Sequence, residues 1–150
     1  MAGRVVLYCA FAFFGVIAFL ATTSDASSRT GECTAVSTAL LSGFADVGAR
    51  IDATDKTDPV KGVAGLLEVA AAYDRLMGDL QRLKIGAADV KNARGDLVRT
   101  TDQLHGWLVS YAQAVQKGEI QNLKSYRGNV EAARREVDEN VKRLQGICSP

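Results

Sequence analysis

Apolar side chains recur every three or four residues along almost the whole chain after residue 32, and no stretch shows the strict alternation of a strand. This spacing is the period of an α-helix that buries one face. The clearest stripe steps by three and four without a break through Leu66, Val69, Tyr73, Leu76, Leu80 and Leu83. A heptad stripe of this kind is typical of helices that pack side by side, as in bundles and coiled coils. The pattern therefore predicts an all-α fold.

Breaks in this pattern divide the chain into four amphipathic segments, over about residues 33–51, 59–84, 87–117 and 119–146. The second segment begins at Asp58-Pro59, a typical helix start, because Asp accepts the free amide hydrogens as N-cap and Pro suits the first helical position. Short connections between long amphipathic helices favour antiparallel neighbours. We therefore expect an up-down-up-down four-helix bundle.

The two later breaks depend on glycine. Gly86 and Gly118 each closely follow a lysine, and a glycine after a basic residue is a typical C-terminal cap of a helix. The break at Gly118 decides the fold, because without a chain reversal there the last two segments would fuse. The alternative is then a three-helix bundle with one long C-terminal helix.

The first 26 residues differ in composition from the rest of the chain. Arg4 precedes the uncharged and mostly apolar run Val5–Ala21, and small polar residues follow it. This order is typical of a secretory signal peptide. An uncleaved membrane anchor is the alternative, because the run is long for a signal and short for a span. In both cases we expect a polar linker at 27–32 and an extracytoplasmic helical domain, periplasmic or secreted, at 33–148.

Two cysteines remain once the apolar run, which contains Cys9, is set aside. These are Cys33 and Cys148, one at each end of the helical domain. An even pair in an oxidising compartment predicts a disulfide, with two buried free thiols as the alternative. An up-down-up-down bundle places the start of its first helix beside the end of its fourth. The helix count and the cysteine count therefore predict the same pairing.

Composition and motifs argue against several classes of protein. A net charge of +1 offers no basic footprint for nucleic acid. His105 is the single histidine, and the sequence has no phosphate loop, zinc-protease motif or nucleophile elbow. We therefore expect no catalytic residue, no metal site and no cofactor.

Two arginines interrupt the apolar pattern of the fourth segment. Counting heptads back from Val141 puts Arg134 and Arg127 at inward positions. In one interpretation the helix rotates slightly, so that Tyr126 and Ala133 face inward and the guanidinium groups reach water. In the other, the two arginines contact an anion or an acidic partner.

These observations predict an exported, non-catalytic helical bundle that serves as an interaction or structural component of the cell envelope or extracellular space. Its partner would be an unknown protein, and it would contact the membrane only through an uncleaved N-terminal segment. The alternative is a bundle that binds or senses a small ligand. An exposed apolar patch would favour the first function, and an interior pocket near Arg127 and Arg134 would favour the second.

Overall fold

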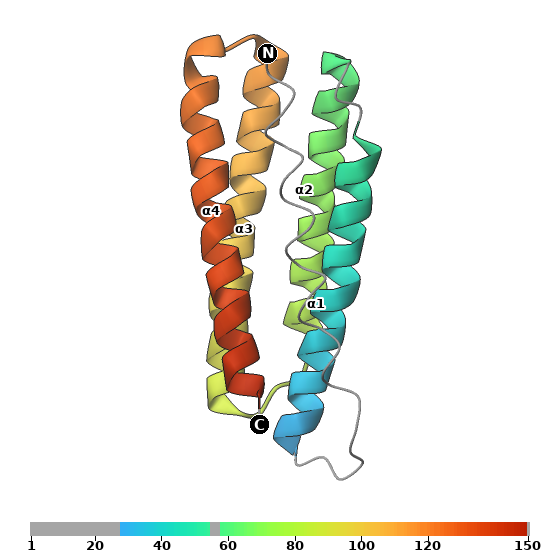
Figure 1. The fold of residues 1–150 in the computed structure, drawn as a ribbon, viewed down its shortest axis with the longest axis vertical. Coiled ribbons are helices and arrows are strands. Elements are labelled where there is room, and N and C mark those ends of the chain that lie inside the picture. Colours follow the sequence, from blue (N-terminus) through green and yellow to red (C-terminus); the bar gives the residue numbers. More distant parts are fainter. Residues whose placement is uncertain (1–27, 55–57, 150) are drawn as a thin grey trace.

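The computed structural model describes residues 28–54 and 58–149, and these form an antiparallel four-helix bundle (Figure 1). The helices are α1 (Ser28–Ala53), α2 (Pro59–Arg82), α3 (Ala88–Lys117) and α4 (Ile120–Cys148). The predicted up-down-up-down bundle is therefore confirmed, and the three-helix alternative is wrong. The expected signal or anchor segment, residues 1–26, lies outside the described residues. No helix of the described part is long and apolar enough to cross a membrane.

The chain reverses between α3 and α4 at Gly118, as the sequence predicts. Gly118 has a left-handed backbone with φ of 71°, which glycine adopts without a steric penalty. Its N–H donates to the carbonyl of Val115 at 3.1 Å, and the N–H of Glu119 donates to that of Ala114 at 2.9 Å. These bonds satisfy carbonyl groups that the end of α3 would otherwise leave free. The last two segments consequently stay separate.

The end of α2 differs from the expected glycine cap. The helix stops at Arg82, and the extended residue Leu83 caps it. Arg94 of α3 donates to the carbonyl oxygen of Leu83 at 2.6 Å, so a cationic side chain takes the place of the cap. The prediction that Gly86 caps α2 is therefore wrong, because this cap comes from a different helix.

α1 begins at Ser28, inside the segment 27–32 that its polar composition marks as a linker. Arg29 forms an ion pair with Asp89 at the start of α3, and Glu32 accepts hydrogen bonds from the α2–α3 connection. These polar contacts stabilise an extra helical turn. An apolar periodicity cannot reveal such a turn, so the predicted start of the helix was too late.

The core is formed by the inward faces of all four helices. Its most deeply buried apolar side chains include Val36, Leu76, Leu80, Leu97, Leu104 and Val137. Gly43 allows α1 and α2 to approach closely, because a Cβ atom added there would lie 2.4 Å from Cδ1 of Leu76. The predicted stripe on α2 is buried in its middle and partly exposed at its two ends, Leu66 and Leu83.

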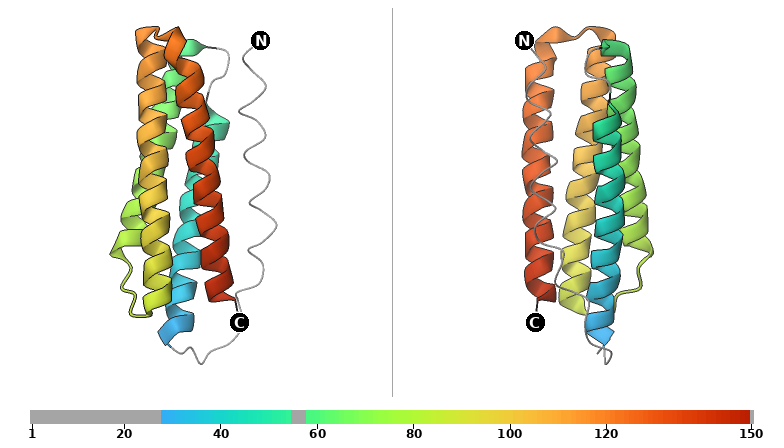
Figure 2. Two further views of the ribbon diagram at one scale, coloured as in Figure 1. Left: turned by 90° about the vertical axis from the view of Figure 1, so that its left-hand side faces the viewer. Right: turned by 45° about the vertical axis from the view of Figure 1, so that its right-hand side comes forward.

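The helices do not pack equally around the bundle. α1 packs along α2, α2 along α3, and α3 most extensively along α4. α1 and α4, in contrast, come close only where Cys33 and Cys148 meet, at the end of the bundle near the C-terminus (Figure 2). Three pairs of neighbouring helices therefore pack closely along their length, whereas α1 and α4 come close at one end.

Candidate functional site

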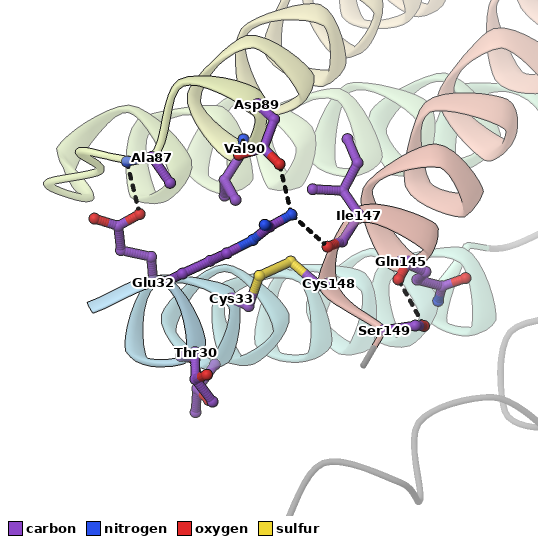
Figure 3. Close-up of a disulfide and its surroundings, with 12 residues drawn as sticks. Thr30, Glu32, Cys33, Ala87, Asp89, Val90, Gln145, Ile147, Cys148 and Ser149 are labelled. Carbon is purple, nitrogen blue, oxygen red and sulfur yellow. Dashed lines mark hydrogen bonds and ion pairs between the residues drawn. A yellow bond between two sulfur atoms is a disulfide. The ribbon is translucent and has the colours of Figure 1, made fainter. Parts of the chain in front are cut away.

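A disulfide joins α1 and α4 at the end of the bundle where these two helices meet. The sulfur atoms of Cys33 and Cys148 lie 2.02 Å apart, and their Cα atoms lie 5.5 Å apart (Figure 3). The bond joins the first turns of α1 to the last residue of α4 across a sequence separation of 115. The disulfide predicted from the sequence is thus present in the structure.

Polar contacts surround the disulfide and bind the same ends together. Glu32 accepts hydrogen bonds from the N–H groups of Gly86 and Ala87, at 2.7 and 3.0 Å. Arg29 pairs with Asp89 and also donates to the carbonyl oxygen of Ile147 at 3.2 Å. Figure 3 shows this cluster, which connects α1 with both α3 and α4. The end of the bundle that holds the disulfide is therefore fixed covalently and electrostatically.

The two arginines predicted as a contact site lie on the side of α4 that turns toward α1. Cys148, Val141, Arg134 and Arg127 follow one another at intervals of seven residues, so they form one stripe along α4. Cys148 is bonded to α1, and helical register therefore places the two arginines on the α1 side of α4. We call the surface formed by this stripe and the facing residues of α1 the α1–α4 side.

The side chains around these arginines agree with a slight rotation of the helix. Ala133 is buried, and Tyr126 packs against Trp107 of α3 with ring centroids 6.2 Å apart. Arg127 reaches the surface and lies 3.0 Å from a carboxylate oxygen of Glu131. Arg134 is only partly buried. That either arginine binds an anion or a partner stays a prediction.

Asp138 is a further member of this surface that the sequence analysis did not identify. Partial burial raises the pKa of its carboxyl above the ordinary value, and the positive charges of Arg134 and Lys142 oppose this rise in part. The carboxyl group of Asp138 is therefore partly shielded from water and lies in the field of two positive charges. The spacing of four residues between Arg134 and Asp138 was the available signal.

Apolar side chains of both helices line the same side. Phe44 and Ile51 of α1 and Val130 of α4 pack on the core but keep part of their surface accessible. Ile51 and Val130 each lie eighteen residues, or five helical turns, from the bonded cysteine of their own helix, and Phe44 lies two turns before Ile51, so helical register places all three on this side. Leu41, one turn before Phe44 on α1, is 41% exposed. The α1–α4 side thus combines accessible apolar surface with charges of both signs.

A separate groove lies between α2 and α3, away from the two arginines. Its volume is about 600 Å³, and its lining includes Asp74, Arg75, Gly78, Arg82, Gly95, Arg99 and Asp102. Gly78 and Gly95 leave the groove hollow because they contribute no side chain. Arg75 is held by Asp46 of α1 at 2.7 Å, and Arg82 is paired with Asp79. The charges of the groove are therefore mixed and largely compensated. Gly78 and Gly95 are the sequence features that leave room for the groove.

His105, the search for metal ligands and the comparisons with known proteins give no further evidence for a function. His105 is partly buried on α3. Within 28–54 and 58–149, no three His, Cys, Asp or Glu side chains cluster so that they could hold a metal ion. The chain matches no family model, no curated protein and no solved structure.

Proposed function

We propose that this protein is an exported, non-catalytic helical bundle that binds a protein partner of the cell envelope or extracellular space through its α1–α4 side. The observation that carries the proposal is the unequal packing of the bundle. The backbones of α1 and α4 come close at the disulfide and lie further apart along the rest of their length than those of the other neighbouring helices. Partly accessible apolar side chains along such a widely spaced pair of helices are typical of surfaces that a second protein covers.

An extracytoplasmic location is supported by two independent features. Disulfides persist mainly in oxidising compartments, and Cys33–Cys148 is compatible with one. Residues 1–26 have the charged, apolar and small polar order of a secretory signal. Fractionation of cells that express the full chain tests this part, and a wholly cytoplasmic protein would contradict it.

The binding surface can be tested with two leucines that are equally exposed. Leu41 lies on α1, one turn before Phe44 of the α1–α4 side, and Leu67 lies on α2. Both leucines are 41% exposed. A photoreactive amino acid at position 41 should give a discrete protein adduct in intact cells, whereas the same group at position 67 should not. Adducts of equal yield at both positions, or none at position 41, would contradict the proposal.

A second candidate function rests on the groove between α2 and α3. Its volume of about 600 Å³ lies within the usual range of small-molecule sites. The mixed charges of its lining fit a zwitterionic molecule better than a simple anion. Titration with free amino acids and with inorganic phosphate, followed by the amide resonances of Gly78 and Gly95, tests this candidate. Unchanged resonances at millimolar concentrations of each probe would count against it.

A further inference from the structure

Four charged side chains alternate in sign along the α1–α4 side of α4. They are Arg127, Glu131, Arg134 and Asp138, at steps of four, three and four residues. These steps keep all four on one stripe of the helix. Arg127 is paired with Glu131, and Asp138 lies in the field of Arg134. The stripe therefore presents positive and negative charges in a defined order along α4.

The order of these charges is complementary to itself when reversed. Read along α4 it is plus, minus, plus, minus, and read backwards it is minus, plus, minus, plus. In two antiparallel copies of α4, Arg127 of one copy would lie level with Asp138 of the second copy. Glu131 would then lie level with Arg134 of the second copy. All four positions of each helix meet an opposite charge, as a two-fold symmetric interface requires.

The centre of this arrangement lies level with Gly48 of α1. It falls next to Ala133, which is fifteen residues from Cys148, and Gly48 is fifteen residues from Cys33. A Cβ atom added at Gly48 would meet no other atom within 4 Å. Gly48 itself therefore adds no side chain at the level where the two charged stripes would cross.

We propose that the partner on the α1–α4 side is a second copy of this chain, bound with the two α4 helices antiparallel. This inference rests on the proposed function, because it names the occupant of the same surface. The apolar side chains Phe44, Ile51 and Val130 supply the area that leaves water on association. Exposed ion pairs add little affinity, but they fix the register and the direction of the two helices.

Neighbouring arginines provide a matched pair of variants for the first test. Arg134 lies on the charged stripe, whereas Arg135 is exposed one residue further around the helix. Arg134→Glu would set a carboxylate against Glu131 of the second copy at two symmetric places. We expect it to weaken self-association about tenfold, and Arg135→Glu to leave it unchanged. The measurement is sedimentation equilibrium of the mature, disulfide-bonded protein.

Inverting the whole stripe gives the sharper second test. The variant combines Arg127→Glu, Glu131→Arg, Arg134→Asp and Asp138→Arg, which preserves the pairs within the helix as well as those between copies. It should associate with itself as tightly as the original chain does. It should not associate with the original chain, because like charges would then face each other. Differently tagged chains, mixed and captured through one tag, measure both results.

The outcomes separate this inference from the proposed function. A mature protein that remains monomeric at about 100 μM would overturn the second-copy proposal, as would an inverted variant that mixes freely with the original chain. An adduct between position 41 and a different protein, found together with a monomeric chain, would leave the proposed function standing. Absence of that adduct and of self-association would contradict both.

Discussion

Glu32 of α1 accepts a hydrogen bond from the backbone N–H of Ala87, the N-cap residue of α3, at 3.0 Å. Ala87 has no side-chain oxygen with which to cap its own helix. The other carboxylate oxygen of Glu32 accepts from the N–H of Gly86 at 2.7 Å. A negative charge at a helix N-terminus is also favoured by the helix dipole. One side chain of α1 therefore supplies the cap that α3 lacks.

Removing this cap should destabilise the bundle. We expect Glu32→Ala to lower the free energy of unfolding by about 1 kcal/mol, as the loss of other N-caps does. Glu68→Ala is the control, because within the described part of the chain Glu68 makes only an exposed ion pair with Arg50. Its effect should stay below about 0.5 kcal/mol. Denaturant titration at neutral pH measures both variants. Equal effects would show that Glu32 contributes no more than a surface charge.

The contact of Gly43 with Leu76 predicts a steric effect. Gly43→Ala should lower the free energy of unfolding by about 1–3 kcal/mol, because the new methyl group would overlap the leucine side chain. Gly106→Ala should instead raise it by about 0.5–1 kcal/mol, since that helical glycine is exposed and an added Cβ meets nothing within 4 Å. Thermal unfolding of the two variants distinguishes these signs. A stabilised Gly43→Ala variant would mean that α1 and α2 pack less closely.

The sequence was sufficient for the features that depend on local spacing. The heptad stripe on α2 predicted a buried face. Lys117 followed by Gly118 predicted the reversal into α4, because glycine readily adopts the left-handed conformation that ends a helix. The bundle topology then brought Cys33 to Cys148 without further information. These predictions succeed because each depends on one helix, on one turn, or on the order in which helices follow each other.

The features that the sequence did not predict depend on residues far apart in the chain. Glu32 and Ala87 are 55 positions apart, and neither forms a recognisable cap motif with its own neighbours. The wide spacing of α1 and α4 depends on how closely each pair of helices packs, which is a property of four interfaces at once. The α2–α3 groove likewise needs Gly78 to face Gly95 across two helices. Periodicity identifies the buried face of a helix, but it does not identify which neighbour that face meets.

Two adjacent threonines of α3 differ in their hydrogen bonding. Both are buried, but Oγ1 of Thr101 has no hydrogen-bond partner among the described residues, whereas Thr100 contacts the side chain of Asn140 at 3.3 Å. Thr101→Val should raise the free energy of unfolding by about 1 kcal/mol, because it removes an unsatisfied buried hydroxyl. Thr100→Val should lower it by a similar amount. Denaturant titration gives both values, and a destabilised Thr101→Val variant would indicate a partner for that hydroxyl.

Asp46 should make the free energy of unfolding depend on pH in the acidic range. Hydrogen bonds from Arg75 lower the pKa of Asp46 below 3.8, although burial opposes them in part. Its contribution is thus present above the unfolded-state pKa and is lost as the pH falls through the lowered folded-state value. Asp46→Asn should cost less than about 1 kcal/mol at pH 7, because the pair is partly exposed.

The same variant should approach the stability of the original chain as the pH falls through the lowered pKa of Asp46. Asp52→Asn serves as the control, because Asp52 is exposed near the end of α1. Unfolding free energies of the three proteins, measured across the acidic range, test the sign. A cost for Asp46→Asn that grows toward low pH would contradict the assignment.

Loss of the disulfide should loosen α1 and α4 at one end of the bundle. The chain-entropy model gives about 4–5 kcal/mol for closing so long a loop, and we expect the Cys33→Ala/Cys148→Ala variant to lose about 2–4 kcal/mol. Amide exchange should quicken most around residues 28–36 and 142–148, because α1 and α4 have little other packing to hold them together. Peptide mass spectrometry of unreduced protein from its own compartment verifies the bond beforehand. Two alkylatable thiols there, or an exchange pattern that does not change at these ends, would contradict this role.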